Sequence, residues 1–278
     1  MVFQHLSDLF FITKWRIEKL TLHTCIRLYS SLIPKKVQAF LDDGEEENYS
    51  AKFLGKLITC ALILPVCYKF FSSYMPFGFW EFWHLPKDNF ITTLLRFWPL
   101  FVWGIILQSI TSFTTLNSYN TNKYAEHILI YRIIKSVFTG VKEEITFRWL
   151  FFLLAIPGAR ISNYIFFGFA GFGIPEFIHN WITGPIANLF SLGLMHDLIL
   201  NPKGWYLGFA LLATNAFFRD GHKYLGLAGF INAWFGGLVL FYAALTYGLP
   251  LAIVLHTSYN ATVSIVLYVD SVLERKFA

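Results

Sequence analysis

Apolar stretches of nearly the length needed to cross a bilayer follow one another from residue 53 almost to the end of this 278-residue chain. A helix needs about 20 apolar residues to cross the hydrocarbon core. The sequence therefore predicts an all-α fold, a polytopic transmembrane helical bundle with about eight membrane segments. The predicted segments are residues 53–71, 90–110, 128–156, 164–178, 185–200, 205–218, 225–247 and 249–269.

The composition supports a membrane protein. The chain is 56% hydrophobic and only 14% charged, with a mean hydropathy of +0.53, whereas soluble proteins average about 25% charged residues. The net charge of +5 comes from Lys and Arg residues scattered through loops and helix ends. This distribution is typical of membrane anchoring and excludes a nucleic-acid partner.

The first 52 residues differ from the rest of the chain. Charged residues such as Arg16 and Lys19 interrupt their apolar positions, so this segment is not a secretory signal. The near-helical spacing of Phe3, Leu6 and Phe10 fits a helix in the membrane interface or a soluble amphipathic helix. We therefore expect a cytoplasmic or interfacial N-terminal segment at residues 1–52 and a transmembrane helical domain at residues 53–278, with its catalytic motifs in 128–269.

The loops between the predicted segments indicate the orientation. With eight segments, twelve Lys and Arg residues fall on the side of the termini and three on the other side. Positive residues favour the cytoplasmic side, so both termini are predicted to be cytoplasmic. The chain is thus expected to be an integral protein of a lipid bilayer, in a bacterial cytoplasmic membrane or a eukaryotic endomembrane. Residues 76–84 are rich in Phe and Trp and predict an interfacial aromatic loop that anchors the chain.

A pair of adjacent carboxylates stands out against this apolar background. Glu143 and Glu144 are followed by Arg148 inside a predicted membrane segment. Ionised side chains at membrane depth are costly and usually functional. On an α-helix, Glu144 and Arg148 share a face and can form a buried pair, whereas Glu143 points about 100° away.

Two further polar groups come later in the chain. Phe218 and His222 end one predicted segment, and His256 and Asn260 lie four residues apart midway along the last. Peptide hydrolysis needs a base for water and donors for the developing oxyanion. Glu143 with His222 can handle protons, and His256 with Asn260 can donate to one oxyanion from a single helix face.

These residues, read in order, form the pattern EExxxR, FxxxH, HxxxN, which resembles the CAAX-protease and bacteriocin-processing family of intramembrane endopeptidases. The resemblance covers residues 128–269 and implies a glutamate-type peptidase. It implies that Glu143 and His222 activate water, that His256 and Asn260 form the oxyanion hole, and that Glu144, Arg148 and Phe218 support them. The implied substrate is a membrane-associated peptide or a lipidated protein, including prenylated CAAX-type tails.

The residues alone are compatible with a metal cofactor and with a mechanism that uses none. Glu143, His222 and His256 could supply three ligands of a catalytic zinc site, although the resemblance implies a metal-free mechanism with no cofactor. Phe218 follows Arg148 by 70 residues, which is longer than the family pattern implies. This interval contains Glu176 and His179, a possible ExxH metal pair, but the surrounding Pro and Gly favour a loop there.

Two other functions remain possible from the sequence. A catalytically silent relative could act as a membrane scaffold or immunity protein. A transporter could use the same intramembrane charges to line a pathway. Matching interrupted half-repeats would favour a transporter, and the sequence contains no clear internal repeat.

Overall fold

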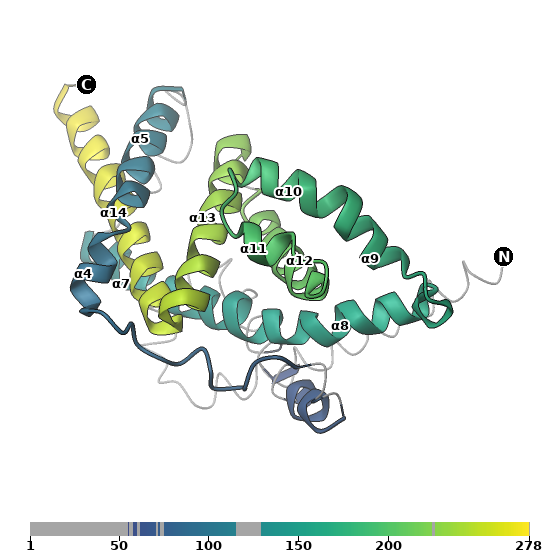
Figure 1. Cartoon of the computed structure of the whole chain (residues 1–278). Helices are drawn as coiled ribbons and strands as arrows, with labels where there is room; N and C mark the ends of the chain where they lie inside the picture. Colours follow the sequence, from purple (N-terminus) through teal and green to yellow (C-terminus); the bar gives the residue numbers. More distant parts are fainter. Residues whose placement is uncertain are drawn as a thin grey trace. The chain divides into compact units, whose positions relative to one another are not determined.

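The computed structural model of the chain describes residues 55, 58–59, 62–70, 72, 75–114, 129–223 and 226–277. By its internal contacts the chain divides into two units, Met1–Val66 and Cys67–Ala278. The predicted interfacial segment 1–52 and its boundary lie outside the described residues, as do Cys25 and Cys60. In the part of the chain that is described, every regular element is a helix and no strand occurs, which confirms the all-α prediction (Figure 1).

The principal helices all belong to the second unit. They are α4 (Phe90–Leu95), α5 (Trp98–Thr114), α7 (Leu129–Glu143), the π-helix η2 (Glu144–Phe151), α8 (Phe152–Ile165), the 3₁₀ turn η3 (Gly168–Ala170), α9 (Ile174–Ile178), the π-helix η4 (His179–Thr183), α10 (Gly184–Phe190), α11 (His196–Ile199), α12 (Trp205–Asp220), α13 (Gly226–Tyr247) and α14 (Leu249–Phe277).

Three helical stretches among the described residues are long and apolar enough to cross a membrane. They are Leu129–Ile165, which joins α7, η2 and α8, then Gly226–Tyr247 and Leu249–Val269. These stretches correspond to three predicted segments and support a membrane protein. Trp98–Leu107 is a shorter apolar helical stretch within α5. The predicted segment 90–110 is interrupted between α4 and α5. The total of eight segments stays a prediction.

The predicted segments 164–178 and 185–200 do not form two separate helices. Instead α9, η4 and α10 join into one helix, Ile174–Phe190, which we call the 174–190 helix. The expectation of a loop around Pro175 was wrong, because Pro175 occupies the first turn of α9, where its missing N–H is not needed. The π-helical turn η4 comes just before Pro185, which cannot donate a regular helical hydrogen bond.

Helix α7 buries its polar face and exposes its apolar one. Its buried residues are Arg132, Ser136, Gly140 and Glu143, whereas large side chains such as Phe138 are exposed. This arrangement is the reverse of a soluble amphipathic helix. It fits a helix whose outer face contacts lipid and whose polar groups face neighbouring helices.

Helices α7 and α14 cross closely, which positions the polar residues of the site. A Cβ atom at Gly140 would lie 2.6 Å from Thr257 Cγ2 and 3.1 Å from the Thr257 backbone nitrogen. Further along the crossing, the hydroxyls of Ser136 and Ser264 are 3.2 Å apart. Small residues therefore let the two backbones approach, as in many membrane helix pairs. Figure 1 shows α5 beside α14.

A turn at Gly248 joins α13 to α14 and receives the aromatic loop. Gly248 has φ +97°, and a Cβ there would collide with the His84 carbonyl. The backbone N–H of Leu249 donates to the Phe82 carbonyl (2.7 Å), and the indole of Trp149 donates to the Phe79 carbonyl (2.7 Å). The predicted anchoring loop is thus also packed against the helices.

Candidate functional site

The two adjacent carboxylates lie where the helix changes its winding. Glu143 is the last residue of α7 and Glu144 the first of the π-helix η2. Both are buried, Glu144 completely. π-Helical turns inside α-helices are rare and frequently occur at functional sites. The irregularity therefore falls at the residues that the sequence singled out.

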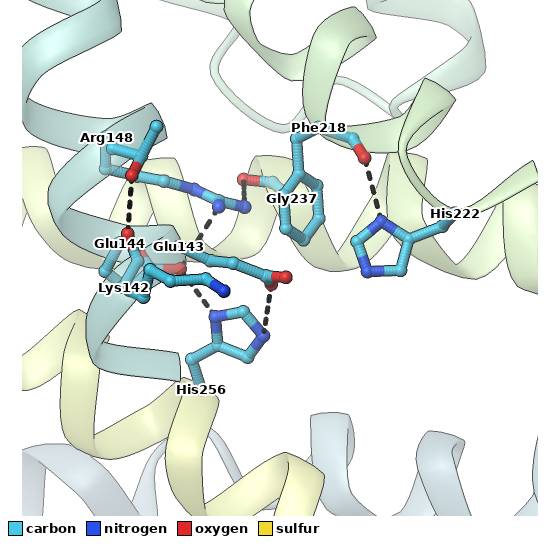
Figure 2. A network of polar contacts seen from close by, with 9 residues as sticks. Lys142, Glu143, Glu144, Arg148, Phe218, His222, Gly237 and His256 are labelled. Carbon is cyan, nitrogen blue, oxygen red and sulfur yellow. Dashed lines mark hydrogen bonds and ion pairs between the residues drawn. The ribbon is translucent and has the colours of Figure 1, made fainter. Parts of the chain in front are cut away.

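His256 of α14 contacts both carboxylates (Figure 2). Its Nδ1 lies 2.7 Å from Glu144 Oε1, and its Nε2 lies 3.6 Å from Glu143 Oε2. Glu143 was expected to point about 100° away from Glu144, but the two carboxylates converge on one imidazole. The change to π-helical winding between them accompanies this convergence.

Arg148 completes the buried ionic group. Its Nη1 lies 3.1 Å from Glu144 Oε1, and both side chains are 0% exposed, so the predicted pair is present. Its Nη2 donates to the Gly237 carbonyl of α13 (3.4 Å). The guanidinium also lies 4.0 Å from the centre of the Phe218 ring, a favourable cation–π contact.

The buried ionic group combines acidic and basic side chains. Glu143, Glu144, Arg148 and His256 are all buried. An isolated charge is costly in an apolar interior, so each member depends on its partners for compensation. The structure supplies such partners, since Glu144 Oε1 contacts both Arg148 and His256.

Phe218 connects His222 to this group. The Phe218 ring centroid is 4.6 Å from that of His222 and 6.0 Å from that of His256. His222 Nδ1 donates to the Phe218 carbonyl (2.8 Å), since a carbonyl can only accept. In the neutral ring it is then Nε2 that can accept. In Figure 2 the Glu143 carboxylate extends towards the side on which His222 lies. The structure thus brings Arg148, His222 and His256 around one Phe ring, and Glu144 is held there by its pair with Arg148.

Asn260 lies one helical turn beyond His256 on α14 and is half-buried. Within the described part of the chain its side chain has no hydrogen bond. No contact there holds the amide in position to stabilise an oxyanion. The amide remains on the helix that carries His256, as its spacing predicted.

A charged cluster follows at the end of α12, next to His222. Asp220 pairs with Arg219 (2.8 Å) and Lys223 (3.0 Å). Burial raises the pKa of Asp220, but the hydrogen bonds from Arg219 and Lys223 outweigh it and hold the pKa below its usual value. This carboxylate therefore stays ionised beside the site. The Arg219 guanidinium also covers the Phe230 ring at 4.4 Å.

The proposed zinc ligands are only partly assembled. Glu143 and His256 are neighbours, but His222 bonds to the Phe218 carbonyl. Among the residues that the structure describes, no group of three His, Cys, Asp or Glu side chains is arranged so that it could hold a metal ion.

Glu176 and His179, the possible ExxH metal pair, each contact a different part of the protein. Glu176 Oε2 accepts from Asn163 Nδ2 (3.1 Å). His179 is fully buried, and its Nε2 donates to the Ile199 carbonyl (2.9 Å). The two side chains therefore turn to different partners and connect α9 and η4 to neighbouring elements.

Sequence reasoning missed several residues that hold the site. Gly237 supplies the carbonyl for Arg148. Asn215 is buried on α12 and donates to the Trp234 carbonyl (3.1 Å), and a Cβ at Gly237 would collide with its side-chain oxygen. Gly140 allows α7 to meet α14. Glycine within an apolar segment was the available signal for both glycines, since such residues mark close helix contacts in membranes.

No family model, curated protein or solved structure matches this chain. Functional inference therefore depends on the residues and their geometry.

Proposed function

We propose that this protein is an intramembrane endopeptidase. The observation that carries the proposal is the contact of one imidazole, His256, with two buried carboxylates that lie next to a buried arginine. Hydrolysis requires a group that accepts a proton from water and returns it to the leaving amine. A buried cluster of two carboxylates and an imidazole has the groups for this requirement.

Glu143 is the proposed base. Its Oε2 is buried and has no hydrogen-bond partner in the described part of the chain, so it can accept a proton from a water molecule. His222 is the proposed second proton carrier, since its accepting ring nitrogen can share that water. The ring of Phe218 lies between His222 and the ionic group and holds the imidazole in position.

His256 is the proposed oxyanion donor, together with Asn260. Glu144 accepts from His256 Nδ1 and thereby fixes the orientation of the ring. When the imidazole carries a second proton, on Nε2, it can donate to a developing oxyanion. Glu144 thus has a second role beyond its pair with Arg148, because it orients the proposed donor.

The motif resemblance to the CAAX-protease and bacteriocin-processing family supports the same roles. On that basis the proposed substrate is a peptide segment at or within the membrane, including prenylated CAAX-type tails, and the proposed mechanism needs no cofactor. The proposed location is a bacterial cytoplasmic membrane or a eukaryotic endomembrane with both termini cytoplasmic.

Purified protein in detergent, incubated with a prenylated peptide, tests the proposal. Wild type is expected to cleave the peptide, and Glu143→Gln and His222→Ala are each expected to lower the rate by about 10²–10⁴-fold. Glu176→Gln and His196→Ala are matched controls, because both residues lie outside the site, and these variants should retain activity. Thermal unfolding of each variant establishes that the fold persists.

Full activity in Glu143→Gln would contradict the site assignment whatever the reaction is. No cleavage of prenylated or unmodified peptides by wild type would instead favour a non-catalytic scaffold or immunity protein. Metal analysis of active protein tests the cofactor proposal, because stoichiometric zinc would contradict the metal-free mechanism.

The same buried cluster supports a second candidate, a proton-coupled transporter. Proton relays in transporters also use Glu, His and Arg residues inside the membrane. Proton uptake into liposomes containing the protein, abolished by Glu143→Gln and accompanied by no peptide cleavage, would favour this function.

A further inference from the structure

The part of the chain between Arg160 and Asp197 is almost free of charge. Glu176 is its only Asp, Glu, Lys or Arg residue. That carboxylate accepts from Asn163 Nδ2 (3.1 Å), while Asn163 Oδ1 accepts from the Glu176 backbone N–H (3.0 Å). The charge is therefore held within the protein and leaves the outer surface of this segment apolar.

The 174–190 helix buries polar groups and exposes apolar ones. His179 is 0% exposed and Ser191, at the end of the helix, is 2% exposed. Trp181 is 73% and Leu189 72% exposed. Contiguous apolar surface of this kind is rare in water and marks contact with a partner or a membrane. The membrane is the favoured partner because α8, which leads into this segment, belongs to a candidate membrane span.

The centre of the 174–190 helix contacts the end of α11 and the start of α12, where the centroid of the His179 ring lies 6.3 Å from that of Trp205. His179 donates to the Ile199 carbonyl, and a Cβ at Gly184 would lie 3.4 Å from Leu200. Charged residues gather at the same place, since the Arg160 guanidinium covers the Tyr206 ring at 4.1 Å and Lys203 comes just before α12. Charged residues next to apolar helices mark the level of the lipid headgroups. The centre of this helix is therefore near the headgroups.

The helix is also short for a membrane span. Its 17 residues extend about 25 Å at 1.5 Å per residue, against a hydrocarbon core of about 30 Å. It is absent from the candidate spans found among the described residues. Figure 1 shows α9 and α10 in line, returning from the end of α8 towards α11 and α12.

We propose that the 174–190 helix lies in the plane of the membrane, with its apolar face against the lipid acyl chains just below the headgroups, and does not cross the bilayer. Amphipathic helices commonly bind membranes in this way. The proposal replaces the predicted segments 164–178 and 185–200 by one in-plane helix. This replacement removes two membrane crossings. Because the number removed is even, every other loop stays on the side of the membrane that was predicted for it. It does not depend on the proposed peptidase activity.

Nitroxide spin labels in liposomes test the proposal. Cys25, Cys60 and Cys67 are replaced, and single cysteines are introduced at Phe177, Trp181 and Leu189 along the exposed face. Collision rates with oxygen, which enters the bilayer, and with a water-soluble nickel chelate report the depth of each label. Lys203→Cys is the aqueous control. Gly236→Cys is the deep control, because Gly236 lies at the middle of the candidate span Gly226–Tyr247 and no atom lies within 4 Å of a Cβ there.

The proposal predicts a similar, shallow depth at all three positions, with a higher oxygen-to-nickel ratio than at Lys203 and a lower one than at Gly236. A depth that changes steadily from Phe177 to Leu189 would overturn it in favour of a helix crossing the bilayer. Nickel accessibility equal to that at Lys203 would overturn it in favour of a surface in water. Exclusion of both reagents, with spin–spin coupling between protein copies, would overturn it in favour of self-association.

Discussion

At the scale of single residues, Glu144 is the centre of the buried ionic group. Its Oε1 interacts with both Arg148 and His256, so three groups depend on one carboxylate. Removing one member of a buried ionic group leaves the others uncompensated, and this usually costs more stability than removing all of them. The group must therefore be studied by combined substitutions.

We expect Arg148→Met to destabilise the protein by about 3–5 kcal/mol, because Glu144 then loses its buried partner. Glu144→Gln should also destabilise. The double variant should lose less than the sum of the two, as expected for residues in direct contact. Chemical unfolding in detergent micelles measures all four proteins, and strictly additive losses would contradict the coupling.

The sequence predicted part of this geometry. The spacing of Glu144 and Arg148 indicated their ion pair, because residues four apart share a helix face. The contact between Glu143 and His256 could not be predicted, since it occurs at an α-to-π transition that no residue pattern indicates. Phe218 was expected to support the site, but its position between Arg148, His222 and His256 depends on how α12 packs.

At the scale of elements, the crossing of α7 and α14 determines whether the site exists. The carboxylates belong to one side of this crossing and His256 to the other. Gly140 permits the backbones of α7 and α14 to approach each other. Ser136 and Ser264 contact each other across the same two helices, two turns away from the carboxylates. A larger residue at the crossing should separate the proposed catalytic groups without touching them.

In a cysteine-free background, Ser136→Cys with Ser264→Cys should form a disulfide on mild oxidation, because the two hydroxyls are 3.2 Å apart. Adding Gly140→Val should lower the yield of this cross-link. Gly158→Val is the matched control, since no atom lies within 4 Å of a Cβ there, and it should leave the yield unchanged. Gel mobility with and without reductant measures the result; an equal yield in the Gly140 variant would contradict the close crossing.

The turn between α13 and α14 gives a second prediction at this scale. Gly248→Ala should destabilise the protein by at least about 1–2 kcal/mol, which is the cost of a left-handed backbone for a residue with a Cβ. The loss should exceed this cost because the added Cβ also collides with the His84 carbonyl. Gly236→Ala in α13 has open space around its Cβ and should not destabilise. Thermal unfolding of the two variants in the same detergent compares them, and equal stability would contradict the packed loop.

At the scale of the whole molecule, α13 and α14 relate the described part of the chain to the membrane. As two consecutive candidate spans, α13 and α14 would place Lys223 and the end of α14 on one side of the membrane and Gly248 on the other. The aromatic loop contacts Leu249, so it must lie on the side of Gly248. The excess of Lys and Arg on the side of the termini predicts that Lys223 is cytoplasmic.

We expect single cysteines at Lys223 and Leu85 to react with a membrane-impermeant maleimide from opposite sides of sealed vesicles. Both parent side chains are exposed, so labelling depends on the side rather than on burial. Vesicles of inverted orientation are the control and should exchange the two results. Labelling of both positions from one side would contradict the crossing of α13.

The sequence predicted the membrane class and three of the apolar helices from their length and composition. It could not separate a crossing segment from a helix such as 174–190, because both are apolar over a similar length. In the 174–190 helix, the polar groups of His179 and Glu176 form hydrogen bonds within the protein. Hydropathy does not distinguish a polar group that has such an internal partner from one that needs water.

The π-helical stretch Glu144–Phe151 has a consequence for insertions and deletions. Wider winding holds more residues in each turn than a regular α-helix, which has 3.6. Loss of a single residue from this stretch would remove the extra residue that the wider winding accommodates and would let ordinary winding resume, in which neighbouring side chains lie about 100° apart. Glu143 and Glu144 would then diverge, and only one of them could reach His256, although every functional side chain would still be present in the chain.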